Sequence, residues 1–149
     1  MELSFDSNVR DLRVDDFLFK IRNDFEDLPA AASAATQFLT AHNASSEVIF
    51  AANLAIEELA TNTIKYGYSD KAQHEITLRL WIAQGTLQIE LCDDGNEFDP
   101  FSHPEPNLRL PSQERQIGGL GLHLVRNMLD TCSYIRREGR NVVRVSKKL

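Results

Sequence analysis

Apolar residues recur at helical spacing between Ser46 and Tyr68, and this pattern predicts a long amphipathic helix. On such a helix they occupy one continuous arc of about 120°, the width of a stripe that faces a protein core. Ser45 or Ser46 can cap the start of the helix, and Gly67 is expected to end it in a left-handed conformation. The apolar arc consists of Val48, Ile49, Ala52, Ala55, Ile56, Leu59 and Thr63.

A strand and a second helix are predicted before this long helix. Phe17, Phe19 and Ile21 recur with a period of two, which is typical of a strand. Asp27, followed by leucine and proline, provides an N-cap and an early-turn proline for an alanine-rich helix up to about residue 42. The sequence leaves open whether residues 1–16 form an edge strand, an arm or a partly disordered segment.

After the long helix the period changes to two, which predicts a β-hairpin. Residues 76–82 and 87–91 place their apolar side chains on one face, and Gln84-Gly85 forms the tight turn between them. Trp81 lies on the opposite face of this hairpin, where we interpret it as a packing residue. We therefore expect a hairpin with one buried side.

A further helix and a second hairpin are predicted at the end of the chain. The helix opens at Gly118-Gly119-Leu120-Gly121, and the hairpin comprises residues 133–137, a turn at 138–141, and residues 142–147. The packing face of this helix is expected to contain Leu122, Val125, Met128 and Leu129.

Length and composition favour one domain covering residues 1–149. The chain has 149 residues, of which 42% are hydrophobic, enough for one core and too few for two ordinary domains. No apolar run approaches the roughly 18 residues of a membrane span, and the N-terminus lacks the order of a signal peptide. We therefore expect a cytoplasmic protein. Cys92 and Cys132 are expected to pack as small hydrophobic residues rather than to form a disulfide.

The formal net charge of −6 restricts the partners of the protein. A negative long-range field repels phosphate, which argues against a general nucleic-acid or anionic-membrane surface. A single phosphorylated ligand remains compatible with this charge if a divalent cation, a helix N-terminus or a few basic side chains compensate locally. The four histidines share no metal-ligand spacing, and we assign none of them to a site.

Three polar residues of the long helix are candidates for chemistry. Glu58 and Asn62 are four residues apart and therefore lie one above the other at the border of the apolar stripe. Lys65 lies beside them. A carboxylate, an amide oxygen and an ammonium group can thus point into one cleft. The pair of Glu58 and Asn62 is a weak signal when taken alone.

Periodicity disappears between residues 94 and 117, where four of the five prolines fall. A loop of this length in a compact domain is usually a lid, a binding loop or a disordered segment. An interdomain linker is disfavoured because the 32 residues after this loop are too few for an independent core.

The order of these features resembles the GHKL ATPase superfamily, which has the Bergerat nucleotide-binding fold, and within it the bacterial anti-sigma-factor serine kinases. The resemblance extends over residues 17–149. Residues 58–62 (Glu-Leu-Ala-Thr-Asn) match the N box of the family, and residues 93–100 (Asp-Asp-Gly-Asn-Glu-Phe-Asp-Pro) match its first glycine box. Residues 119–122 (Gly-Leu-Gly-Leu) match the second glycine box.

The resemblance implies an α+β two-layer sandwich, in which helices cover one face of a mixed, mostly antiparallel sheet. It also implies that residues 94–117 form an ATP lid and that ATP and Mg²⁺ are the cofactors. Asn62 would bind Mg²⁺, and Glu58 would act as the catalytic base. Asp93 would accept the adenine amino group and Gly95 would let the backbone approach the base. The phosphate site would comprise Gly118, Gly119, Leu120 and Gly121, with Lys65 nearby.

The leading hypothesis is an ATP-dependent protein serine kinase that phosphorylates an anti-sigma antagonist, a STAS-type protein, and also sequesters a sigma factor. One alternative is a non-catalytic, nucleotide-gated protein-binding module that uses the same pocket. Another is the detached catalytic domain of a histidine kinase. We disfavour the latter because the segment before the first secure helix is too short for a phosphoacceptor helical hairpin. The sequence leaves open whether the protein forms a homodimer.

Overall fold

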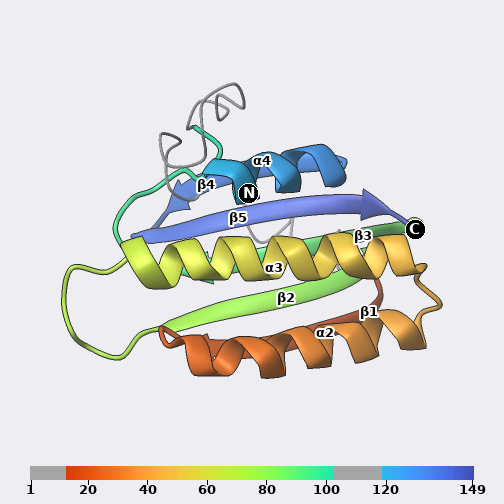
Figure 1. Cartoon of the computed structure of the whole chain (residues 1–149), viewed down its shortest axis with the longest axis horizontal. Helices are drawn as coiled ribbons and strands as arrows, with labels where there is room; N and C mark the ends of the chain where they lie inside the picture. Colours follow the sequence, from red (N-terminus) through yellow and green to blue (C-terminus); the bar gives the residue numbers. More distant parts are fainter. Residues whose placement is uncertain (1–12, 103–118) are drawn as a thin grey trace.

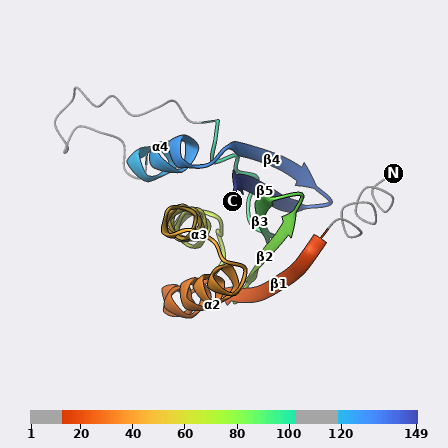
Figure 2. The same cartoon turned by 90° about the vertical axis from the view of Figure 1, so that its right-hand side faces the viewer.

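A five-stranded sheet carries helices on one face, and this arrangement confirms the expected α+β two-layer class (Figures 1 and 2). The computed structural model describes residues 13–102 and 119–149. All four strand pairings in this part of the chain are antiparallel, in the order β1-β2-β3-β5-β4. The strands are β1 (Arg13–Arg22), β2 (Glu75–Ala83), β3 (Thr86–Asp93), β4 (Thr131–Arg137) and β5 (Arg140–Lys148). The helices are the 3₁₀ turn η1 (Phe25–Asp27), α2 (Leu28–Ala41), α3 (Ser46–Tyr66) and α4 (Gly119–Met128).

The predicted strands are confirmed, with one change in the second hairpin. Both hairpins have two-residue turns whose residues have positive φ: Gln84 (52°) and Gly85 (72°) in one, and Glu138 (51°) and Gly139 (76°) in the other. Such turns match the right-handed twist of the strands they join. The predicted turn at 138–141 was therefore two residues too long. Asn141 belongs to β5, where it pairs with Arg136 of β4.

Helix α3 lies between α2 and α4 over the sheet (Figure 2). Its core face is confirmed, because Val48, Ile56 and Leu59 are all at most 4% exposed. Alanines make up much of the buried surface of α3, and small side chains let a helix approach its neighbours closely. The alanines buried in α3 are Ala51, Ala52, Ala55 and Ala60.

The helix ends follow the predictions in part. Ser45 caps α3, since its side chain accepts a hydrogen bond from Val48 N at 3.2 Å. The predicted left-handed conformation of Gly67 was wrong, because this residue is right-handed at φ −79° and ψ −19°. Its lack of a side chain matters for another reason: a Cβ would lie 2.6 Å from the carbonyl oxygen of Thr63. Asp27 precedes α2 without capping it, because its carboxylate binds the Arg22 guanidinium at 2.7 Å.

The remaining packing predictions agree with the structure. Trp81 is 1% exposed, and the guanidinium carbons of Arg79 and Arg144 lie 5.4 and 5.2 Å from its ring centroid. Cys92 and Cys132 are both free thiols. In α4, Leu122 and Val125 are buried with Met128 packed beside them, and Leu129 is buried directly after the helix. None of the helices described in the structure is long and apolar enough to span a membrane.

We predict that Ala55→Leu destabilises the fold by about 1 to 3 kcal/mol, because the added carbons overpack a fully buried position of α3. Urea unfolding measures this change. Phe50→Leu is the matched control: Phe50 is on the same helix but 60% exposed, so its free energy of unfolding should change by less than about 0.5 kcal/mol. An unchanged free energy of unfolding in Ala55→Leu would show that α3 has spare room above the sheet.

Candidate functional site

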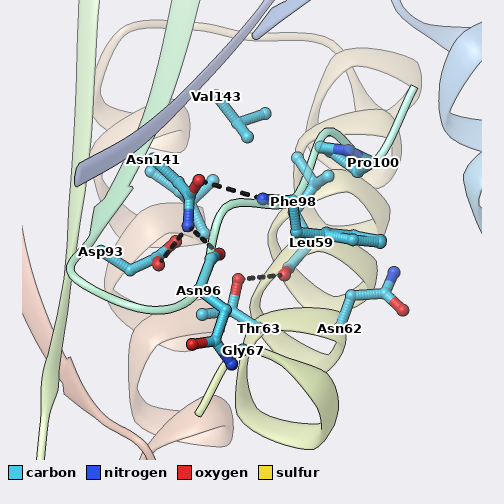
Figure 3. Close-up of a pocket in the computed structure, with 11 residues that line it drawn as sticks. Leu59, Asn62, Thr63, Gly67, Asp93, Asn96, Phe98, Pro100, Asn141 and Val143 are labelled. Carbon is cyan, nitrogen blue, oxygen red and sulfur yellow. Dashed lines mark hydrogen bonds between the residues drawn. The ribbon is translucent and has the colours of Figure 1, made fainter. Parts of the chain in front are cut away.

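A pocket lies between α3, the C-terminal end of β3 with its following loop, and the start of β5 (Figure 3). It combines buried polar groups with an apolar wall, as ligand sites commonly do. Residues from the predicted N box and first glycine box meet here, although about 30 residues separate them in sequence. The lining residues are Leu59, Asn62, Thr63, Gly67, Leu91, Asp93, Asn96, Phe98, Pro100, Asn141 and Val143.

Asp93, the last residue of β3, presents a buried carboxylate to this pocket. It is 4% exposed, and its Oδ1 accepts hydrogen bonds from Gly95 N and Asn141 Nδ2, both at 2.9 Å. Within residues 13–102 and 119–149, no donor reaches its Oδ2. Burial raises the pKa of this carboxyl, while the hydrogen bonds from Asn141 and Gly95 act in the opposite direction. The arrangement fixes one oxygen and leaves the other as an acceptor for a ligand.

Asn141 is a candidate site residue that the sequence analysis missed, because it lines the pocket from β5. Its Oδ1 accepts hydrogen bonds from Phe98 N (3.3 Å), Tyr134 Oη (2.6 Å) and Arg136 Nη1 (3.0 Å). Its Nδ2 donates to Asp93 and also to the carbonyl oxygen of Asn96 at 2.8 Å (Figure 3). This single side chain therefore ties the first glycine box to β4 and β5.

A signal for Asn141 was present in the sequence. A two-residue turn at Glu138-Gly139 places Asn141 on the same face of β5 as Val143 and Val145, and all three are buried. An asparagine on the core face of a strand needs several hydrogen-bond partners, and that requirement marks it as a candidate site residue.

Gly95 is positioned by the backbone of the α3–β2 connection. A Cβ on Gly95 would lie 2.5 Å from the carbonyl oxygen of Gly67 and 3.0 Å from Asp93 Oδ1. That carbonyl of Gly67 also accepts a hydrogen bond from Asn96 N at 2.7 Å. The lack of a side chain at Gly95 thus permits close contact between two loops. The predicted contact of Gly95 with a base stays a prediction.

Asn62 and Glu58 lie on neighbouring turns of α3, and Asn62 alone of the two lines the pocket. Asn62 is 8% exposed and lines the pocket, and its Nδ2 donates to the backbone carbonyl of Glu58 at 3.0 Å. This bond orients the amide, and no donor among the described residues reaches its Oδ1. Glu58 is half-buried beyond the pocket lining. Burial raises the pKa of its carboxyl, Glu57 raises it further, and Lys65 lowers it.

The second glycine box lies next to Glu58. Gly119 begins α4, and a Cβ on Gly121 would overlap the Glu58 carboxylate. Leu120 is 42% exposed and does not line the pocket. Lys65 is exposed, and its charge acts on Glu58 without the residue lining the pocket. The predicted site residue Gly118 lies outside the described residues.

Only the first part of the predicted lid at 94–117 is described. Phe98 and Pro100 line the pocket, and the carbonyl oxygen of Phe101 accepts a hydrogen bond from Arg126 of α4. Residues 94–102 therefore pack against the body of the protein. Residues 103–117 lie outside the described part of the chain.

The donor set fits a Mg²⁺ ion that arrives with phosphate. Across the described ranges, no group of three or more His, Cys, Asp or Glu side chains is placed to hold a metal. Mg²⁺ keeps several waters and is usually bound by one or two protein oxygens together with substrate phosphates. Asn62 Oδ1 at the pocket wall is compatible with that mode of binding.

Known proteins are similar to this chain in sequence. The serine-protein kinase RsbW of Listeria monocytogenes serovar 1/2a is 28% identical over 103 residues, which cover 66% of each chain. The serine/threonine-protein kinase BtrW of Bordetella bronchiseptica is 28% identical over 97 residues, covering 65% of this chain and 68% of its own. The chain thus spans about two thirds of the length of these curated relatives.

The fold itself has a solved counterpart. The structure of the RsbU and RsbW domains of Rv1364c from Mycobacterium tuberculosis superposes with a TM-score of 0.67 at 13% identity, covering 91% of this chain and 33% of that one. The family model of the histidine kinase-like ATPase domain matches residues 21–147. Because this match spans nearly the whole chain, the protein belongs to the histidine kinase-like ATPase domain family.

Proposed function

We propose that this protein binds Mg-ATP in the Asp93 pocket and transfers the γ-phosphoryl group to a serine of a partner protein. The observation that carries this proposal is the buried Asp93 carboxylate in the pocket lining: Asn141 and Gly95 fix one oxygen, and no donor among the described residues reaches the other. An adenine amino group is a donor that fits this acceptor. Membership in an ATPase domain family and the names of the similar kinases support the same assignment.

The phosphates would extend from this pocket along α3 toward α4. Asn62 would supply an oxygen to Mg²⁺, and the ion would neutralise phosphate charge on a protein whose net charge is −6. The N-terminus of α4 offers backbone N–H groups and a favourable helix dipole at Gly119 and Gly121. We retain Gly118, Leu120 and Lys65 as proposed neighbours of the phosphates.

Glu58 is the proposed general base. It would take the proton of the partner's serine hydroxyl while the serine oxygen bonds to the γ-phosphorus and the bond to the β-phosphate oxygen breaks. Burial raises the pKa of the Glu58 carboxyl, which makes Glu58 a stronger base once it is ionised. Because Gly121 has no Cβ, the Glu58 carboxylate can lie directly beside the start of α4.

The partners are proposed from the likeness to the kinases named RsbW and BtrW. A STAS-type antagonist would be the phosphate acceptor, and a sigma factor would be held by the same chain in the cytoplasm. We further propose a single domain in which residues 94–117 act as the ATP lid. A nucleotide-gated binding module is the second candidate, because it would use the same Asp93 pocket. The two candidate functions differ in whether Glu58 acts as a general base.

We predict that Asn141→Ala weakens Mg-ATP binding by about 5- to 150-fold, because loss of a buried hydrogen-bonding group costs about 1 to 3 kcal/mol. Calorimetric titration measures the dissociation constant. Tyr134→Phe is the graded control, since it removes only one of the three donors to Asn141 Oδ1 and should have a smaller effect. Wild-type affinity in Asn141→Ala would show that Asp93 binds nucleotide without the hydrogen bond from Asn141.

Glu58→Gln should retain nucleotide affinity and lose phosphoryl transfer by about 10²- to 10⁴-fold, the usual contribution of a positioned general base. Transfer from labelled ATP to candidate STAS-type proteins, followed by phosphosite mapping, provides the measurement. Glu57→Gln is the matched control: this exposed neighbour on α3 acts on Glu58 through its charge alone, so transfer should change far less than in Glu58→Gln. If wild type binds ATP yet never phosphorylates a candidate partner, the nucleotide-gated module becomes the better assignment.

A further inference from the structure

His74 lies between two carboxylates next to the first glycine box. It follows α3 in the connection to β2, and its Nε2 is 2.7 Å from Asp70 Oδ1. Its Nδ1 is 3.1 and 3.3 Å from the two carboxylate oxygens of Asp94. Asp94 directly follows Asp93, the proposed adenine acceptor. The imidazole therefore links the α3–β2 connection to the loop that forms the pocket.

The ring is held in place from other directions as well. It stacks on Tyr68, with ring centroids 4.2 Å apart and an interplanar angle of 13°. The backbone of His74 pairs with Asn23, which donates its N–H to His74 O at 3.0 Å and accepts from His74 N through its side chain at 2.9 Å. A change in the protonation of His74 therefore acts on the contacts with Asp70 and Asp94 more than on the ring position.

The chemistry of imidazole makes this bridge depend on its proton. A neutral imidazole has one N–H and one lone pair, so it can donate to only one of two carboxylates. The imidazolium ion donates to both. Deprotonation thus leaves a lone pair of the ring facing either Asp70 or Asp94, and that contact becomes repulsive.

The charges around the ring favour the protonated form. Asp70 comes from the same connection and Asp94 from the loop after β3, and both raise the pKa of His74, with the Asp70 hydrogen bond as the largest cause. Burial raises the pKa of Tyr68, so this residue stays a neutral phenol. The charge of Arg140 of β5 lowers the pKa of Tyr68. Because the folded pKa exceeds the unfolded value of about 6.5, the bridge stabilises the fold below that pH and is lost as pH rises through the folded pKa.

The bridge bears on the nucleotide pocket because the same two segments touch at other points. Asn96 N donates to the Gly67 carbonyl at 2.7 Å, and Asn96 Nδ2 donates to Ser69 Oγ at 2.8 Å. Asn96 lines the pocket with Asp93. The α3–β2 connection therefore packs against the loop after Asp93. His74 of this connection provides a titratable contact with the loop.

We propose that His74 is a positioning residue of the nucleotide site: its imidazolium bridges Asp70 and Asp94, holds the loop after Asp93 in the binding geometry, and makes nucleotide affinity fall when the proton is lost. The role rests on the nucleotide binding proposed above. His74 acts through Asp94 and the loop and touches no reacting group.

The first test needs no variant. The His74 ring signals of the full-length protein are titrated by NMR with and without saturating Mg-ADP. Binding that requires the bridge must raise the pKa of His74 by linkage, and a coupling of about fivefold or more in affinity is expected. An identical His74 titration with and without bound nucleotide would overturn the proposal.

The second test compares Mg-ADP dissociation constants between pH 6 and 8.5. Affinity of the wild type should fall across this range relative to His74→Gln, because protonation of the nucleotide itself affects both proteins equally. His42→Gln is the control, since His42 lies at the end of α2 with its ring against the Phe38 carbonyl, and it should keep the wild-type profile. Parallel profiles for wild type and His74→Gln would contradict the role of His74.

Failure of the proposed function is distinguishable from failure of this inference. If Mg-ADP binds at no pH, both are overturned, whereas a bound nucleotide with pH-independent relative affinity overturns only the positioning role. A His74 pKa at or below about 6.5 in the free protein would overturn the bridge itself.

Discussion

The hydrogen bond between Asn141 Nδ2 and Asp93 Oδ1 is the interaction on which the site depends. A buried carboxylate is costly unless hydrogen bonds compensate it, and Asp93 is 4% exposed. Among the described residues, Asp93 accepts from Gly95 N and Asn141 Nδ2. Asn141 is itself held by β4 and by the loop after β3. The carboxylate is therefore fixed in advance, with one oxygen directed to the protein and one available to a ligand.

Close backbone packing provides the second constraint. The loop after β3 can rest on the α3–β2 connection only because Gly95 has no Cβ to meet the Gly67 carbonyl, and α4 can approach Glu58 only because Gly121 has none. These contacts bring the N box of α3 between the two glycine boxes. The pocket thus lies where α3, the end of β3 and the start of β5 converge, and the start of α4 lies beside Glu58.

Much of this arrangement was predictable from periodicity. The apolar arc of α3 and the period-two runs of β2 and β3 predicted their elements, because one face of each is buried. The position of Asn141 was not predicted, since its assignment depends on a two-residue turn rather than a four-residue one. The contact between Gly95 and Gly67 and the bridge at His74 were also missed, because both join segments that only tertiary packing brings together. The conformation of Gly67 was predicted wrongly. A glycine at a helix end suggested a left-handed residue, but Gly67 is right-handed, and the close carbonyl oxygen of Thr63 explains why a glycine is present there.

Recognition of adenine by Asp93 is tested most directly by calorimetric titration of Mg-ATP and Mg-GTP into wild type and Asp93→Asn. We expect wild type to bind ATP in preference to GTP. We expect Asp93→Asn to lose that preference, with ATP affinity reduced by about 5- to 150-fold for a buried mismatch of about 1 to 3 kcal/mol. A wild-type protein that binds neither nucleotide, or a variant that retains the preference for ATP, would contradict adenine recognition by Asp93.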